Sequence, residues 1–204
     1  MDREQRIVFA TGNEGKMREV RAVLADLGLP VFSMKDLELH ADIVEDGTTF
    51  EENARIKARA VHAITGGLVL ADDSGLEVDA MGGAPGVYSA RFMGEDTSYE
   101  IKNQAIIDQV AGCVGAERSA RFRCVIAAVF PDGHEEVAEG TIEGQIAERP
   151  SGSGGFGYDP IFWLPGRGLT TADLPAEEKN AISHRGQALR IMAGRIAAWQ
   201  EEQK

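Results

Sequence analysis

Short apolar runs alternate with longer stretches of mixed polarity in the first third of the chain. Ile7–Thr11, Val31–Ser33 and Leu68–Ala71 are short and apolar, which predicts three buried strands. The segments between them, Gly15–Leu27 and Phe50–Ile64, are predicted helices. The order strand, helix, strand, helix, strand indicates an α/β protein.

The rest of the chain predicts two more helices and a long hairpin. Helices are expected at Ser98–Val110 and Arg185–Trp199. Ala120–Phe130 alternates apolar and polar positions, and the turn at 131–133 joins it to a second arm at Glu135–Ala147. A hairpin added to parallel strands predicts a mixed sheet. Because no long linker interrupts the pattern, residues 1–204 are expected to form one domain.

Composition and charge exclude several classes of protein. The net charge of −12 argues against a general nucleic-acid binder, which normally has a basic face. No apolar run approaches the roughly 20 residues that cross a bilayer, and the charged residues 1–6 do not resemble a signal peptide. We therefore expect a cytoplasmic protein without a membrane contact. Cys113 and Cys124 are expected to be free thiols.

The turn after the first strand is a candidate anion site. Its glycines let backbone N–H groups face an anion at a helix N-terminus, and its lysine adds a cation. The spacing fits neither a Walker loop nor the dinucleotide fingerprint, and an ordinary strand-to-helix turn stays open. The residues are Thr11, Gly12, Asn13, Glu14, Gly15 and Lys16.

Two adjacent acids follow the third predicted strand, in the sequence Asp72-Asp73-Ser74-Gly75. Ligands of open α/β sheets bind beyond the carboxyl ends of strands, so both acids are placed to meet Mg²⁺. A solvated turn in which aspartate caps backbone N–H groups is the alternative.

Glu45 and the helix after it supply a third group. Glu45 is a candidate metal ligand, and Asn53 and Lys57 share a helix face four residues apart. Thr48 or Thr49 is expected to cap this helix. A solvated helix face is the alternative for the whole group.

Two further groups lie in the last third of the chain. The glycine-rich segment 152–160 carries Phe156 and Tyr158, whose rings can stack on a base or fill the edge of the core. The segment 179–186 brings lysine, histidine and arginine together, and Ser183 is a candidate cap of the last helix.

The order of these motifs resembles the inosine triphosphate pyrophosphatase family, the Ham1-like enzymes that act on dITP, ITP and XTP. The motifs Thr-Gly-Asn-x-Gly-Lys, Ala-Asp-Asp-Ser-Gly-Leu, Gly-Phe-Gly-Tyr-Asp-Pro and Ser-His-Arg occur in that order, and the resemblance runs from Ile7 to Trp199. It implies an elongated mixed sheet with flanking helices, two lobes around a central cleft, a homodimer, and a Mg²⁺-dependent hydrolase of purine nucleoside triphosphates.

The resemblance also implies roles for residues. Asp73 is the general base and a metal ligand, and Glu45 is the other ligand. On physical grounds, Mg²⁺ on these carboxylates, together with Lys16 and Lys57, can neutralise the charge that grows on the leaving pyrophosphate. Thr11–Lys16 holds the triphosphate. The remaining substrate-binding residues are Ser74, Phe156, Gly157, Tyr158, Asp159, Lys179, His184 and Arg185.

Some points stay open at the level of sequence. Whether Asp73 is base or ligand is undecided, because metal coordination lowers the basicity of a carboxylate. His184 or Arg185 would donate to the purine 6-oxygen. The segment 170–174 departs from the family pattern, but we expect it to touch none of the assigned residues. A nucleotide-binding regulator and a pyrophosphatase of modified pyrimidine or methylated nucleotides are the alternative functions.

Overall fold

The computed structural model describes residues 6–203, and the chain forms two compact units. The first unit holds the chain up to Asp73, then Cys124–Gly140 and the part from Arg185 onward. The second unit holds Ser74–Arg123 and Thr141–His184. The expected cleft between two lobes stays a prediction. Residues 1–5, which bear on the expected absence of a signal peptide, lie outside the described residues.

One sheet of seven strands has the order β2-β1-β3-β4-β5-β6-β7. β1 pairs in parallel with β2 and β3, whereas β6 pairs antiparallel with β5 and β7, so the sheet is mixed as expected. The strands are β1 (Ile7–Phe9), β2 (Val31–Ser33), β3 (Leu68–Val78), β4 (Ser119–Val129), β5 (Glu135–Ile146), β6 (Phe162–Leu164) and β7 (Leu169–Thr170).

The helices confirm the predicted ones within a few residues. They are α1 (Glu14–Leu24), α2 (Phe50–Thr65), α3 (Tyr99–Gln109), α4 (Ala176–Ile182) and α5 (His184–Glu202). The pattern missed α4, β6 and β7, which have seven, three and two residues. Ser183 ends α4 and directly precedes α5.

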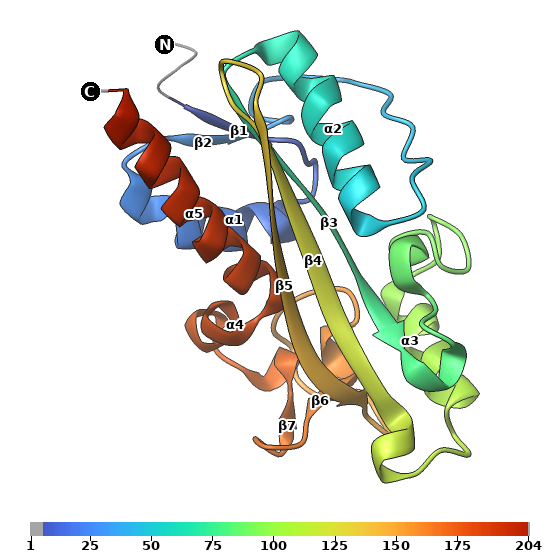
Figure 1. Ribbon diagram of the computed structural model, residues 1–204. Coiled ribbons are helices and arrows are strands. Elements are labelled where there is room, and N and C mark those ends of the chain that lie inside the picture. The colour runs from blue at the N-terminus through green and yellow to red at the C-terminus, as the bar shows by residue number, and fades with distance from the viewer. Residues whose placement is uncertain (1–5, 204) are drawn as a thin grey trace. The chain divides into compact units, whose positions relative to one another are not determined.

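In the first unit, alternate residues of each strand face different helices. Ile7, Phe9, Leu68 and Leu70 share one buried cluster with hydrophobic residues of α1 and α5. Their sequence neighbours Val8 and Val69 are equally buried but lie outside that cluster, because successive side chains of a strand point to opposite faces. Figure 1 shows α2 apart from the α1–α5 pair, with β1 and β3 between them.

The second unit has a core of its own. Ile106 and Ile107 of α3 pack with Leu76 and Val78 of β3 and with Phe162 of β6. Tyr158 of the segment 156–159 belongs to this core.

None of the helices in the described part of the chain is long and apolar enough to cross a membrane. Both cysteines are free thiols, as expected.

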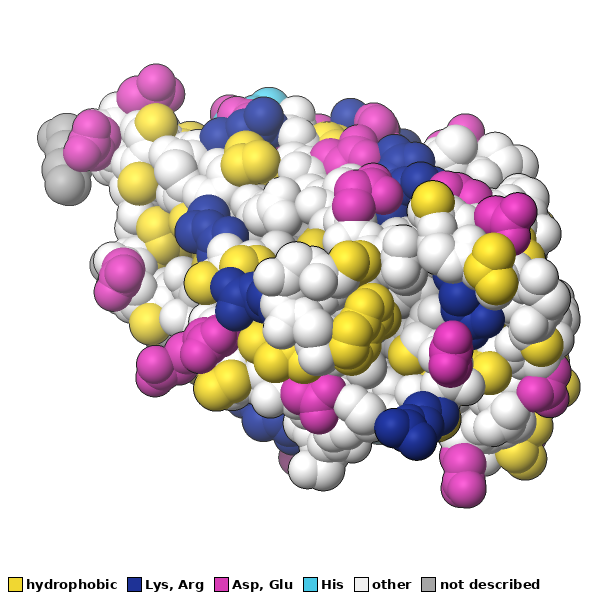
Figure 2. All heavy atoms as spheres, turned by 90° about the horizontal axis from the view of Figure 1, so that it is seen from below, with side chains coloured by type: hydrophobic (Ala, Val, Ile, Leu, Met, Phe, Trp, Pro, Cys, Tyr) yellow, Lys and Arg dark blue, Asp and Glu magenta, His cyan; other side chains and the backbone are white. Residues whose placement is uncertain are grey.

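On the face shown in Figure 2, acidic, basic and hydrophobic side chains are interspersed. This face therefore has no continuous basic area, as expected for a chain with a net charge of −12.

Candidate active site

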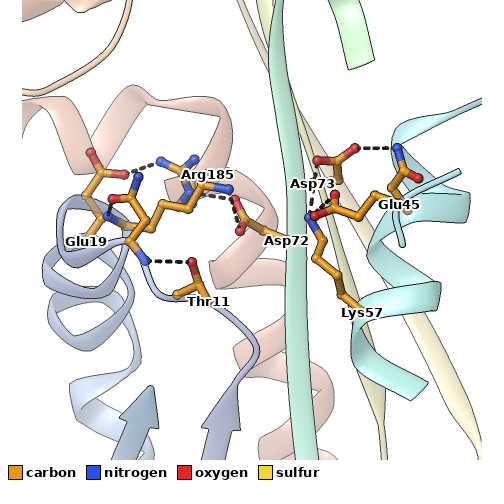
Figure 3. Close-up of polar contacts among 10 residues, drawn as sticks. Thr11, Glu19, Glu45, Lys57, Asp72, Asp73 and Arg185 are labelled. Carbon is orange, nitrogen blue, oxygen red and sulfur yellow. Dashed lines mark hydrogen bonds and ion pairs between the residues drawn. The ribbon is translucent and has the colours of Figure 1, made fainter. Parts of the chain in front are cut away.

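Glu45, Lys57 and Asp73 converge in the first unit. The Lys57 Nζ donates to Glu45 Oε2 at 2.8 Å and to Asp73 Oδ1 at 3.3 Å. Asn53 Nδ2 donates to Asp73 Oδ2 at 3.2 Å, and its Oδ1 accepts from the Gly47 N–H at 2.9 Å. Asn53 and Lys57 do therefore share one face of α2, and that face carries contacts to both predicted metal ligands (Figure 3).

The start of α2 brings the Glu45 segment close to the helix. Thr49 caps α2 in a capping box with Glu52, which decides between the two predicted caps. A Cβ added at Gly47 would lie 2.6 Å from Asn53 Oδ1 and 2.7 Å from the Glu52 Cβ. Only glycine permits this approach, so Gly47 is part of what places Glu45 beside Lys57.

Burial and charge act in opposite directions on these groups. Burial raises the pKa of the Asp73 carboxyl above its ordinary value, although Lys57 and Lys16 partly offset the change. Burial by itself would lower the pKa of Lys57, but Asp73, Asp72 and Glu45 raise it overall. Lys57 is therefore a permanent cation beside a carboxylate that binds a proton more readily than an exposed aspartate.

Asp72 lies on the other face of β3, where its partners differ from those of Asp73. Its Oδ1 accepts from Lys16 Nζ at 2.9 Å and its Oδ2 from Arg185 Nε at 3.1 Å. Arg185 also donates through Nη1 to Glu19. Figure 3 shows the carboxylates of Asp72 and Asp73 on opposite sides of the β3 ribbon.

The Asp72 group is a fully compensated buried ion network. Burial alone would raise the pKa of the Asp72 carboxyl, but Lys16 and Arg185 lower it far below its ordinary range. Asp72 is 1% exposed and Arg185 is 3% exposed, so neither charge is screened by solvent. The prediction that β3 ends before these acids is wrong, because the strand continues to Val78. Each acid finds cations on its own face, so the strand can bury both of them.

The Thr11–Lys16 turn opens α1 as predicted. Asn13 caps the helix by accepting from the Lys16 N–H at 3.0 Å, and Thr11 Oγ1 accepts from the Asn13 N–H at 3.1 Å. Glu14 forms an exposed ion pair with Lys35 at 3.0 Å. The structure thus places Lys16 at a helix N-terminus, with its ammonium held by Asp72.

In the second unit, Asp159 organises the glycine-rich segment. It accepts from the Phe156 N–H at 2.8 Å, from Thr171 Oγ1 at 2.8 Å and from Lys179 Nζ at 2.5 Å. Lys179 Nζ also lies 4.9 Å from the centre of the Phe156 ring. The Thr171 contact corrects the expectation that the segment 170–174 touches no assigned residue.

The two aromatic rings of this segment have different environments. Tyr158 is buried in the second core, and its hydroxyl donates to the Ser89 carbonyl at 2.7 Å. Phe156 is only half-buried, so of the two rings it is the one with surface for a base. His184 is buried and stacks on Phe122 with ring centres 4.8 Å apart. Ser74 continues β3 and is half-buried.

Sequence reasoning missed the partners of the buried ions. Glu19 follows Lys16 by three positions on α1, a spacing that places both on one helix face and was available from the sequence. Arg185 is distant in sequence from both carboxylates that it contacts, so no local pattern could have paired them. Asn103 and Lys102 of α3 were missed for the same reason.

Comparisons with known proteins identify the family to which the chain is similar. A sequence profile of the Ham1 family matches residues 7–195. The dITP/XTP pyrophosphatase of Geobacter sulfurreducens is 47% identical over 195 residues, which cover 96% of this chain and 98% of that protein. A protein of that name from Thermus thermophilus is 49% identical over 192 residues, covering 94% of this chain and 92% of its own.

Solved structures give the same result. A HAM1 protein from Coxiella burnetii superposes with a TM-score of 0.85 at 40% identity, covering 95% of this chain and 98% of that one. A nucleoside-triphosphatase, dITP/XTP pyrophosphatase, from Mycobacterium abscessus has a TM-score of 0.72 at 41% identity, covering 92% and 98%. The mixed α/β fold and the order of the sequence motifs agree with this assignment, and the chain belongs to the Ham1 family.

Proposed function

We propose that this chain hydrolyses the non-canonical purine nucleoside triphosphates dITP, ITP and XTP to the monophosphate and pyrophosphate. The observation that carries the proposal is the convergence of Glu45 and Asp73 on the Lys57 ammonium, with Asn53 donating to Asp73. Its support is the identity of 47–49% with dITP/XTP pyrophosphatases over nearly the whole chain.

The chemistry of the proposed step suits these side chains. A water oxygen attacks the α-phosphorus, the bond from that phosphorus to the bridging oxygen breaks, and pyrophosphate leaves with the electron pair. Asp73 takes the proton of the water or orients that water, and burial raises the pKa of its carboxyl while no metal is bound. Lys57 and Lys16 neutralise the negative charge that gathers on the leaving group.

The donor set fits Mg²⁺. Glu45 Oε2 and Asp73 Oδ1 both accept from the Lys57 ammonium, at 2.8 and 3.3 Å, so the two carboxylates lie close enough together to share a cation. Within residues 6–203 no group of three or more His, Cys, Asp or Glu side chains is placed to hold a metal. Two carboxylates suffice for Mg²⁺, which keeps waters and binds phosphate oxygens. When bound, the ion would supply charge stabilisation at the phosphates.

The proposal assigns the nucleoside to the second unit. Phe156, Asp159 and Lys179 form one contact group there, and His184 lies buried beside Phe122. A buried donor that faces the purine 6-oxygen would meet another donor in adenine. Such a mismatch costs about 1–3 kcal/mol, or roughly 10- to 100-fold in specificity. Arg185 already donates to Asp72 and Glu19, which leaves His184 as the simpler candidate.

A substrate panel tests the proposal. Purified protein with Mg²⁺ is offered ITP, dITP, XTP, GTP, ATP and a modified pyrimidine triphosphate, and pyrophosphate and orthophosphate are measured separately. We expect pyrophosphate from the first three substrates. Release of orthophosphate would refute the reaction, and binding of ITP without turnover would favour a nucleotide-binding regulator. Omission of the metal, with Mn²⁺ and Ca²⁺ as replacements, tests the metal requirement.

Assembly and location belong to the same proposal. We expect a homodimer in the cytoplasm, on the resemblance to the family alone. Light scattering coupled to size-exclusion chromatography gives the mass in solution, and a mass near that of one chain, 21.9 kDa, would mean a monomer.

A further inference from the structure

Helix α3 contacts the segment 156–159 at three points, through side chains of α3 that have no assigned role in the site. Asn103 Nδ2 donates to the Gly157 carbonyl at 3.1 Å. The Tyr99 ring packs edge-on against Tyr158, with centroids 5.2 Å apart. A Cβ added at Gly157 would lie 3.5 Å from the Tyr99 ring, so the backbone of Gly157 lies directly against this side chain.

Helix α3 also contacts the segment 84–91, and that segment contacts the segment 156–159. Lys102 is 1% exposed, and its ammonium donates to the Ala90 carbonyl at 2.7 Å. The neighbouring Ser89 carbonyl accepts from the Tyr158 hydroxyl at 2.7 Å. Helix α3 and the segments 84–91 and 156–159 are thus joined in a closed triangle of contacts.

The Asn103 amide is an unusual choice for a purely structural contact. The side chain is 4% exposed, and its Oδ1 has no hydrogen-bond partner among the described residues. A buried acceptor without a partner costs free energy, which a leucine of similar volume would avoid. What leucine cannot supply is the N–H that holds the Gly157 carbonyl.

We propose that Asn103 is a positioning residue that fixes the Gly157 backbone, and with it Phe156 and Asp159, for the nucleoside. This inference rests on the proposed function. Gly157 has a φ of +67°, and because glycine reaches many backbone conformations without strain, the hydrogen bond from Asn103 restricts which of them it adopts. Because Phe156 precedes it and Asp159 follows by two residues, a shift of Gly157 moves the side chains assigned to the nucleoside. It leaves Lys16, Lys57 and Asp73 in place.

The test compares Asn103→Leu with the wild type and with Gln104→Leu, which changes an exposed neighbour on the same helix. In Asn103→Leu we expect the KM for ITP to rise about ten-fold, as one lost hydrogen bond predicts, with kcat within a factor of about two. Inhibition by inosine monophosphate should weaken by the same factor, whereas inhibition by pyrophosphate should not change. Gln104→Leu should match the wild type in all four measurements.

Two results would overturn the inference while the wild type is active. One is an unchanged KM in Asn103→Leu, and the other is a uniform loss that includes weaker pyrophosphate inhibition. If Asn103→Leu does not fold, Tyr99→Ala removes the other contact with Gly157, and the same rise in KM is required of it. A wild type that does not turn over ITP would refute the proposed function itself, and the inference with it.

Discussion

Asp72 and Asp73 are adjacent in β3, yet their surroundings differ in kind. Asp72 accepts hydrogen bonds from Lys16 and Arg185, and these two cations lower the pKa of its carboxyl strongly. Asp73 contacts Lys57 and the neutral Asn53, and its pKa is raised. One carboxylate is locked as an anion, and the other can exchange a proton.

The comparison shows how a strand separates two tasks with two consecutive residues. Side chains that follow one another in a strand point to opposite faces, so each acid meets a different set of helices. The Asp72 face is neutralised internally by side chains of α1 and α5. The Asp73 face carries the two carboxylates that fit a divalent ion. The first face is expected to govern stability mainly, with Lys16 as its one contribution to the proposed reaction, and the second face is expected to govern turnover.

The largest effect is expected for Asp73→Asn. The amide keeps the shape of the side chain but can neither accept the proton of the water nor offer an anionic ligand. Turnover of ITP should fall about 10³-fold, within the range of general base catalysis. Steady-state pyrophosphate release measures this, with circular dichroism to check the fold and the exposed Asp132→Asn as the matched control. A variant that keeps more than about a tenth of the normal rate would remove Asp73 from the mechanism.

The next effect is on stability, in Asp72→Asn. This change leaves Lys16 and the buried Arg185 without their shared anion, although Glu19 still contacts Arg185. Removal of one partner of a buried ion pair costs about 3 kcal/mol or more. Urea unfolding should show this loss relative to the wild type, and Asp132→Asn should lose less than about 0.5 kcal/mol. Equal stability of the two variants would mean that the buried network contributes nothing.

The dependence of stability on pH should have opposite signs for the two acids. The folded pKa of Asp72 is lowered, so its contribution is complete above the ordinary value of about 3.9 and is lost below it. The stability gap between the wild type and Asp72→Asn should therefore narrow as the pH falls below about 4. The pKa of Asp73 is raised in the folded state, so the ionised carboxylate costs stability at higher pH. The free energy of unfolding of the wild type should therefore rise relative to that of Asp73→Asn as the pH falls.

Urea unfolding of the three proteins at several pH values between about 3 and 7 measures both trends. Parallel curves for Asp72→Asn and the wild type would contradict the lowered pKa of Asp72.

The smallest effect is expected for Gly47→Ala. The new Cβ would overlap Asn53 Oδ1 and Glu52 Cβ, so the Glu45 segment must move away from α2. The apparent affinity for Mg²⁺ should weaken about ten-fold, the equivalent of roughly 1.4 kcal/mol, while turnover at saturating metal stays closer to normal. Gly112→Ala is the matched control, because a Cβ there meets nothing within 4 Å. A normal metal titration of Gly47→Ala would show that Glu45 does not bind the ion.

The sequence by itself determined the elements that have a clear period or an unambiguous cap. The short apolar runs became β1 and β2, the capped segment after Thr49 became α2, and the glycine turn with Asn13 opened α1. These outcomes depend on contacts within a few residues of each position, so local spacing contains the information. The shared face of Asn53 and Lys57 belongs to the same class, because four residues make about one helical turn.

Only the tertiary structure decided what each charged group faces. The sequence Asp72-Asp73 is compatible with a solvated turn, and the burial of both acids depends on cations supplied by α1, α2 and α5. The hydrogen bond from Asn103 to Gly157 was also decided by the tertiary structure, because it joins residues that are 54 positions apart in the sequence. The electrostatic energy of a buried ion depends on distance in space and on the loss of solvent, and neither quantity is encoded in the neighbouring residues of the chain.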